Sequence, residues 1–281
     1  MRTRFLPKLT NAEVEQYLET NDVIFVPVGT VEMHGALPLD CETVISEAFA
    51  LKLAEKVNGL VLGSLPYFYA GATPTGRGTV EVSVREGIDY LSAIAHSLLR
   101  QGFRRQIYLS LHGPAHMTCS PMVRDFFDDT GAPVLYLDMM ISAMKNCKDL
   151  FTYMSSFNAL FFGAYDMLNR LSDIPLTTDE NDCSQYVPQT VAFANPLFAQ
   201  AYQSGSIGYY FGEATDHAPT PCVKTVEERQ ALADTGRTLI EKIVDRLHIE
   251  DTVRQMKELD DFHKEKVFPR YPWVPAAHNQ K

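Results

Sequence analysis

Residues 26–47, VPVGTVEMHGALPLDCETVISE, place four side chains that can bind a metal directly behind an apolar run. The apolar run, residues 23–28, contains a Pro near its end and is followed by a Gly, as when a strand passes into a loop. Because alternate side chains of an extended segment point to the same side, Glu32 and His34 can face one cation or one pair of cations. Oxygen and nitrogen donors of this kind suit Zn, Mn or Fe. The four side chains are Glu32, His34, Asp40 and Glu42.

The loop itself has the composition of a sharply turned segment. Gly29, Gly35 and Pro38 favour turns rather than a solvated helix face. Leu37 and Leu39 are expected to hold the loop against a core while the acids project away. A polar loop with a Glu and a His two residues apart is also common without any metal, so an ordinary loop stays open as the alternative.

Helices and strands alternate along most of the chain. Residues 60–65, LVLGSL, are mostly apolar, which predicts a parallel strand covered on both faces. A capping-box pattern at residues 10–13 predicts a short first helix. The alternation predicts an α/β fold with a mostly parallel sheet. We expect further helices at residues 43–57, 86–103 and 225–247, and further strands at residues 79–84, 106–111 and 133–137.

Two later segments carry similar side chains. His112 follows the strand expected at residues 106–111, and parallel sheets open their binding crevice at the carboxyl ends of strands. Asp216 and His217 follow a Gly- and Tyr-rich stretch. His116 lies four residues beyond His112, but a His bonded to a backbone carbonyl is an equally good interpretation.

The remaining regions give broader expectations. Residues 139–171 are rich in Met and Phe, which favours a helical subunit interface or a wall of the substrate site, with core packing as the alternative. Residues 172–205 are irregular and favour a lid or an inserted loop. We expect one domain over residues 1–250 and an extended C-terminal arm over residues 251–281.

Composition excludes several classes of protein. The chain has 281 residues, a net charge of -10 and no run of Lys or Arg, so nucleic acid and anionic membranes are poor partners. Its five cysteines are scattered without a CxxC pair, which argues against a disulfide framework or a zinc knuckle. No apolar stretch reaches ~18 residues and no signal-peptide pattern is present, so a cytoplasmic enzyme of small polar substrates is expected.

The run GTVEMHGALPLDCET resembles the opening signature of the creatininase (creatinine amidohydrolase) family. That signature has a Glu, a His two residues later, a Leu-Pro-Leu segment and an acid eight residues past the His, matched here by Glu32, His34 and Glu42. The usual acid of the family is Asp, one carbon shorter than Glu42. His112 matches a metal-binding His of the second signature only in part, and Asp216-His217 resemble the start of the third.

The resemblance implies a site with two divalent ions that share Glu42. One ion would also bind Glu32 and His112, and the other would bind His34 and a Glu that this chain lacks. His217 would then be the proton-carrying catalytic residue, with Asp216 beside it. We expect Zn or Mn, or alternatively Fe, at one or two ions per chain. The candidates for the missing ligand are, in order of preference, Glu213 and Asp216, then Asp40 and Cys222.

The same resemblance implies a three-layer α/β/α sandwich, a homo-oligomer such as a hexamer, and a metal-dependent hydrolase. Creatinine specialists close tryptophans over their substrate, whereas Trp273 is the single Trp of this chain. The residues of the first signature most resemble those of the inosose-ring hydrolases. This resemblance favours C–C ring opening of a dehydro-inosose in inositol catabolism. Two alternatives stay open: an amidohydrolase acting on a cyclic amide or formamide, and a non-catalytic binding protein that has lost its metals.

Overall fold

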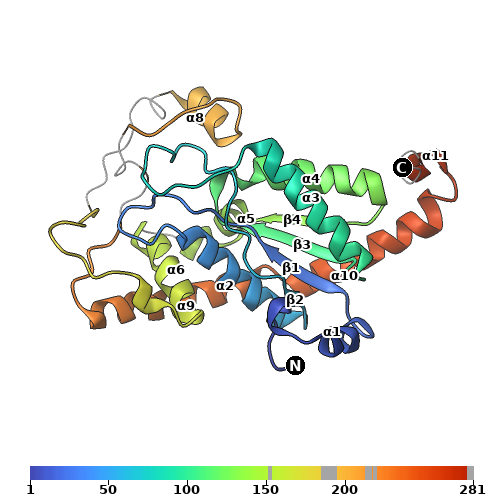
Figure 1. The fold of residues 1–281 in the computed structure, drawn as a ribbon, viewed down its shortest axis with the longest axis horizontal. Helices are drawn as coiled ribbons and strands as arrows, with labels where there is room; N and C mark the ends of the chain where they lie inside the picture. Colours follow the sequence, from blue (N-terminus) through green and yellow to red (C-terminus); the bar gives the residue numbers. More distant parts are fainter. Residues whose placement is uncertain (151–153, 185–194, 213–216, 218–219, 277–281) are drawn as a thin grey trace.

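The computed structural model describes residues 1–150, 154–184, 195–212, 217 and 220–276 (Figure 1). Its centre is a four-stranded sheet in the order β2-β1-β3-β4, in which every neighbouring pair is parallel. The strands are β1 Val23–Pro27, β2 Leu60–Val61, β3 Arg105–Ser110 and β4 Leu135–Asp138. The parallel sheet predicted from the alternation is confirmed, although β2 is much shorter than the run at residues 60–65.

Helices cover both faces of this sheet, as Figure 1 shows. Alternate side chains of β1 enter different cores, so that Phe25 packs in one hydrophobic cluster and Ile24 in the other. The Phe25 core contains side chains of α2 Cys41–Lys56, α6 Met154–Met167 and α9 Val226–Arg246. The Ile24 core contains side chains of α1 Asn11–Leu18, α3 Val84–Arg100 and α4 His116–Thr130. These layers confirm the predicted α/β/α sandwich.

Capping boxes fix where three of the helices begin. They lie at Thr10 for α1, Ser83 for α3 and Thr225 for α9. The capping box at Ser83 explains why the prediction of a strand at residues 79–84 was wrong. The Ser83 side chain accepts a hydrogen bond from the Glu86 backbone N–H, so the chain is already committed to a helix there, and only Val80 forms an isolated bridge, with Val31.

The Met- and Phe-rich region forms α5 Met139–Asn146 and α6. Leu160, Phe161 and Phe162 of α6 are buried in the core that contains Phe25. For these side chains the alternative of core packing is confirmed, and a role of other residues in a subunit interface stays a prediction. The smaller elements are η1 Leu6–Lys8, η2 Gly113–Ala115, η3 Lys148–Leu150, η4 Leu171–Asp173 and α8 Pro196–Gln203.

The C-terminal region is helical, which corrects the extended arm expected over residues 251–281. Helix α10 spans Ile249–Phe262, a π-helical turn follows at His263–Val267, and α11 spans Trp273–Ala276. The reason is a stripe of apolar side chains at helical spacing that packs into the core and includes Val253 and Met256. Residues 277–281 lie outside the described part of the chain.

An ion pair joins α10 to Arg104, the residue that precedes β3. The Arg104 guanidinium donates two hydrogen bonds of 2.6 Å to the Asp260 carboxylate, which also accepts one from Lys264 at 2.7 Å. Asp260 is 6% exposed. Although burial raises the pKa of Asp260, the hydrogen bonds from Arg104 and Lys264 outweigh it, so the pKa lies below its ordinary value.

Because the pKa of Asp260 is lowered by folding, its stabilisation is present above the ordinary carboxyl pKa of about 4 and is lost as the pH falls below that value. We expect Asp260→Asn to lower the free energy of unfolding at pH 7 by about 2 kcal/mol. The variant should also lose part of the acid dependence. Urea unfolding at pH 7 and pH 3 tests this, with Asp261→Asn as the control on the same helix, and equal losses in both variants would contradict it.

Two general sequence expectations can also be compared with the structure. Among the described residues, no helix combines the length and apolarity needed to cross a membrane. All five cysteines are free, as the scattered spacing predicts.

Candidate metal centre

The loop after β1 is folded so that its polar side chains turn inward. The Glu32 backbone N–H donates to the Leu39 carbonyl at 2.9 Å, which closes the loop on itself. Gly29 lies so close to α2 that a Cβ there would be 2.4 Å from the Thr43 Cα, so only glycine fits. The loop therefore delivers Glu32 and His34 to the first turn of α2, where Glu42 lies.

Glu32, Glu42 and His112 form a group that could hold a metal ion, named here the first ligand group. Their exposed fractions are 0%, 7% and 3%. His112 Nδ1 lies 3.3 Å from Glu32 Oε1 and is hydrogen-bonded to Glu42 Oε2. His112 Nε2 lies 2.9 Å from the Tyr69 carbonyl oxygen, which can only accept a hydrogen bond. The Tyr69 contact therefore places the ring proton on Nε2 and directs Nδ1 between two carboxylates.

The first ligand group requires a positive charge between its members. Although burial alone would lower the pKa of His112, the Glu42 and Glu32 carboxylates raise it well above its ordinary value. Burial raises the pKa of Glu32, whereas His112 outweighs burial at Glu42 and holds that pKa below its usual range. Without a metal, a proton on His112 Nδ1 supplies the charge. A divalent cation would displace that proton.

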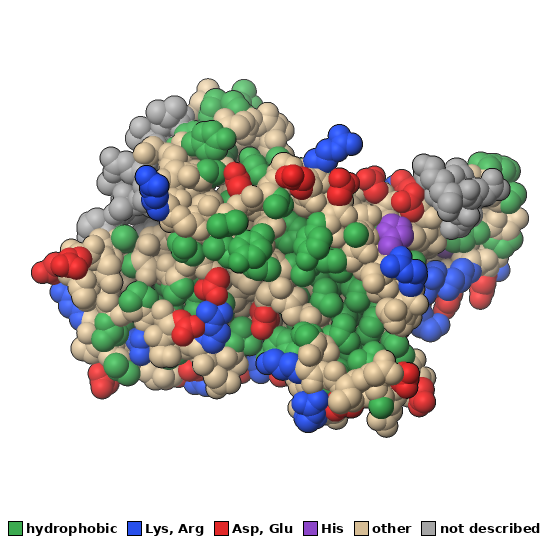
Figure 2. Space-filling model, viewed as in Figure 1, with side chains coloured by type: hydrophobic (Ala, Val, Ile, Leu, Met, Phe, Trp, Pro, Cys, Tyr) green, Lys and Arg blue, Asp and Glu red, His purple; other side chains and the backbone are tan. Residues whose placement is uncertain are grey.

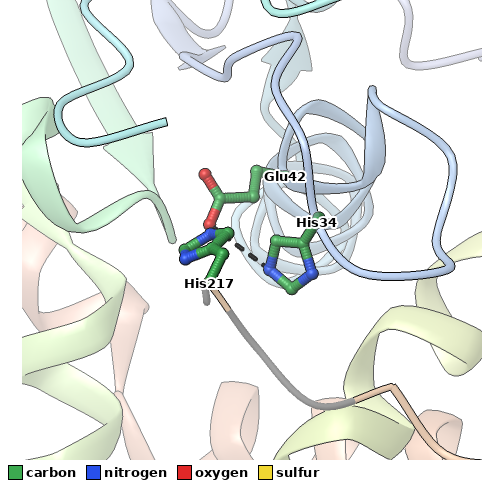
Figure 3. A group of neighbouring side chains, drawn as sticks. All are labelled: His34, Glu42 and His217. Carbon is green, nitrogen blue, oxygen red and sulfur yellow. Dashed lines mark ion pairs between the residues drawn. The ribbon is translucent and has the colours of Figure 1, made fainter. Parts of the chain in front are cut away.

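His34, Glu42 and His217 form the second ligand group, which Figure 3 shows. His34 Nε2 lies 3.9 Å from Glu42 Oε1, and the rings of His34 and His217 meet edge-on with centroids 4.6 Å apart. Within each ligand group, the ligand atoms all lie within 4.8 Å of one another. Glu42 belongs to both groups and stands between them.

Three buried atoms of the two groups make no hydrogen bond in the described part of the chain. They are Glu32 Oε1, His34 Nδ1 and His217 Nε2. Buried polar atoms are almost always paired, so a cluster of unpaired ones indicates a missing partner. Burial lowers the pKa of His34. Burial and the neighbouring His34 together lower the pKa of His217 to about 3. Both rings are therefore neutral and have a free lone pair. This donor set fits divalent cations.

Aromatic side chains surround the second ligand group. The Phe161 ring of α6 lies 4.7 Å from the His34 ring, and the Phe211 ring lies 5.4 Å from the His217 ring, both measured between centroids. Phe211 also packs with Met33 and Ala72 in a small buried cluster. These apolar walls limit water at the site and strengthen charge interactions inside it.

The structure brings together five of the predicted site residues: Glu32, His34, Glu42, His112 and His217. The predicted residues Glu213 and Asp216 lie outside the described residues. Asp40 is engaged elsewhere, because it accepts a hydrogen bond from the Tyr165 hydroxyl at 2.5 Å and pairs with Arg170 at 2.8 Å. Cys222 is exposed, unlike the ligands.

His116, which the sequence left open, has its Nδ1 2.9 Å from the Gly113 carbonyl oxygen. The interpretation as a carbonyl-bonded His therefore holds for that nitrogen.

Sequence reasoning missed two threonines that orient the carboxylates. The Thr73 hydroxyl donates to Glu32 Oε2 at 2.6 Å, and the Thr30 hydroxyl donates to Glu42 Oε2 at 3.0 Å. Both threonines are buried. Thr73 lies in the Gly- and Thr-rich stretch that follows β2, and that composition was the only signal in the sequence. The two hydroxyls leave the other carboxylate oxygens free for a cation.

We expect Thr73→Val to weaken metal binding at the first ligand group by roughly 10- to 100-fold, as loss of a supporting hydrogen bond typically does. Valine keeps the shape of the side chain and removes only the hydroxyl. Competition with a coloured chelator measures the affinity. Thr118→Val is the matched control, because the buried Thr118 hydroxyl makes no hydrogen bond in the described structure. Equal affinities in the Thr73 variant and the wild type would contradict the expectation.

Comparison with known proteins gives a family match. A sequence model of the family described as "Creatininase: Creatinine amidohydrolase" matches residues 7–160, more than half of the chain. The chain is also 31% identical over 115 residues to the 3-dehydro-scyllo-inosose hydrolase of Thermotoga maritima. That alignment covers 39% of this chain and 36% of the hydrolase, so the chain spans little more than a third of the length of the curated relative it matches.

Solved creatininase structures share the fold. One, described as creatininase Mn, gives a TM-score of 0.60 at 17% identity and covers 89% of this chain and 99% of its own. Another, a mutant described as the Zn-Zn type, gives a TM-score of 0.59 at 17% identity with the same coverage of 89% and 99%. At this identity the likeness establishes the fold alone.

Proposed function

Since the chain belongs to the creatininase family, we propose that it is a metal-dependent hydrolase that opens the ring of a small polar cyclic substrate. The observation that carries this proposal is the pair of buried ligand groups that share Glu42. Such an arrangement of two carboxylates and three imidazoles in a core has a high cost in desolvation without cations. Structures of creatininase described as Mn and Zn-Zn types support Zn or Mn as the cations.

The residues of the site have two roles: some would hold the cations, and others orient the side chains that do so. Glu32 and His112 would hold one cation, His34 would hold the other, and Glu42 would bridge them. When bound, divalent cations lower the pKa of a water molecule toward ~7 and polarise the carbonyl group under attack. Thr30, Thr73 and the Tyr69 carbonyl fix the orientation of the ligands before substrate arrives, which reduces the reorganisation needed during the reaction.

We propose a dehydro-inosose as the substrate, with hydrolysis of a C–C bond next to a carbonyl. In that reaction water adds to the carbonyl carbon, the C–C bond breaks, and the departing carbon leaves as an enolate that is then protonated. The inosose hydrolase match over 39% of the chain supports this choice. The position of Trp273 supports it too, because that sole tryptophan lies 69% exposed in α11, makes an edge-to-face contact with Tyr271 and belongs to neither ligand group.

A cyclic-amide hydrolase is the second candidate, favoured by the description of the family as creatinine amidohydrolase. The two reactions differ in the leaving atom, which is carbon in the first and nitrogen in the second. The third idea, a binding protein that has lost its metals, has less support because each of the two groups brings three potential donors together.

Metal analysis combined with a substrate panel tests these proposals. Protein purified without added metal is analysed for bound ions, loaded with Zn or Mn, and assayed on a dehydro-inosose, creatinine and a cyclic imide. Ring opening of the dehydro-inosose by the loaded protein, but not by the stripped protein, is the expected result. Release of an amine or amide product alone would favour the second candidate. Absence of metal binding on titration would overturn the proposal of a hydrolase with this site.

A further inference from the structure

We propose that His217 is the third protein ligand of the second metal position, together with His34 and Glu42. The inference rests on the proposed function and deepens it. The family resemblance gives that position a Glu, which this chain lacks, and it gives His217 the separate role of carrying a proton. The structure instead favours His217 as a metal ligand.

The segment after His112 offers no acidic side chain to complete the second position. It reads Gly113-Pro114-Ala115, and η2 formed by these residues leads directly into α4. Asp40 is engaged by Tyr165 and Arg170. Without a further donor, His34 and the shared Glu42 would be the only protein ligands of this cation among the described residues, whereas three protein ligands are usual even in catalytic sites.

The geometry supplies His217 as that donor. Its ring nitrogen lies with the ligand atoms of His34 and Glu42 inside 4.8 Å, the spread that a single ion can bridge. The rings of His34 and His217 are inclined at 74° with centroids 4.6 Å apart, an edge-to-face contact that brings the two imidazoles together beside Glu42. Figure 3 shows His34, Glu42 and His217 grouped together, with the ion pair between His34 and Glu42 dashed.

The surroundings of His217 support a ligand role. His217 Nε2 is buried and makes no hydrogen bond in the described structure. It lies 3.7 Å from Glu32 Oε1, an oxygen of the first ligand group. The Phe211 ring lies against the His217 ring, with centroids 5.4 Å apart. A buried nitrogen without a hydrogen-bond partner, beside a carboxylate and a second imidazole, is an arrangement that a cation completes.

A histidine in this place changes the chemistry of the second position. The first ligand group offers two carboxylates and one imidazole, whereas the second would offer two imidazoles and one carboxylate. Nitrogen-rich sets favour Zn over Mn, and oxygen-rich sets accept Mn readily. The two positions should therefore differ in metal preference, with Zn favoured at the second and Mn admitted at the first.

The decisive experiment counts metals rather than turnover. With Zn, His217→Ala should bind about one ion per chain where the wild type binds about two, because a two-ligand site is too weak to survive gel filtration. His34→Ala should give the same loss. His217→Glu, which restores the carboxylate of the family, should recover the second ion. Zinc X-ray absorption should show fewer imidazole neighbours per ion in His217→Glu than in the wild type.

The outcomes separate this inference from the proposed function. If His217→Ala keeps two Zn ions with wild-type affinity and loses activity, His217 is a proton carrier and the inference is overturned while the hydrolase proposal stands. If the wild type takes up only one ion, the second position does not exist and the inference is again overturned. If the wild type takes up none, both proposals fall. Circular dichroism and the melting temperature of the metal-free variants confirm that each is folded.

Discussion

Replacing Glu42 with alanine should remove both metal positions in one step and lower turnover by about 10³-fold or more, since the lost charge stabilisation is worth several kcal/mol. Glu42 is the only residue common to the two ligand groups. Its carboxylate is also hydrogen-bonded to His112 Nδ1. Metal analysis after gel filtration should find no tightly bound ion in Glu42→Ala.

Two further variants serve as comparisons for Glu42→Ala. Glu42→Asp keeps a carboxylate and matches the acid that the resemblance assigns to this place, so it should retain metal with reduced affinity. Glu55→Ala removes an exposed glutamate from the same helix α2 and should behave as the wild type. Two bound ions in Glu42→Ala would show that the two groups do not share a bridging carboxylate.

The first ligand group was predictable from the sequence because its signals are local. Of its three members, Glu32 lies in the loop directly after an apolar strand, and His112 follows another strand that is the parallel neighbour of the first in the sheet. Parallel strands bring their carboxyl ends to one edge, so residues far apart in sequence meet there without any knowledge of loop paths. The strand pattern alone therefore positions these ligands.

The second ligand group was not predictable in the same way. Among the described residues, no strand leads into His217, so neither periodicity nor strand order predicts its contact with His34 and Glu42. The role of His217 was therefore assigned from the resemblance, and the missing ligand was sought among Glu213, Asp216, Asp40 and Cys222. Thr73 was missed for a similar reason, because its contact with Glu32 depends on the path of a Gly- and Pro-rich loop.

Helix α10 shows a second reason why the sequence alone did not predict the structure. Its apolar stripe is present in the sequence, but the run FPRYPW beyond it favoured an extended arm. Burial of Ile249 and Met256 against the sheet core decides in favour of the helix. Tertiary packing, rather than local preference, determines the structure there.

Replacing Gly236 with alanine should destabilise the fold by about 3 kcal/mol, as overpacking of a tight contact does. A Cβ at Gly236 of α9 would lie 1.8 Å from the Ala159 carbonyl oxygen, and one at Gly163 of α6 would lie 2.3 Å from the Gly236 carbonyl carbon. The two helices therefore cross backbone to backbone. In an exposed helix the same change would stabilise by about 1 kcal/mol, so the sign of the effect identifies the contact.

The helix α6 that crosses at Gly236 also carries Phe161, which lies against His34. Separation of the helices should therefore loosen the second ligand group as well as the core. For a chain of this size we expect the melting temperature to fall by roughly 6 to 12 °C, at about 2 to 4 °C per kcal/mol. Lys242→Ala, an exposed change on the same helix, should stay within about 0.5 kcal/mol of the wild type. A Gly236→Ala protein that melts at or above the wild-type temperature would show that the backbones do not meet at this crossing.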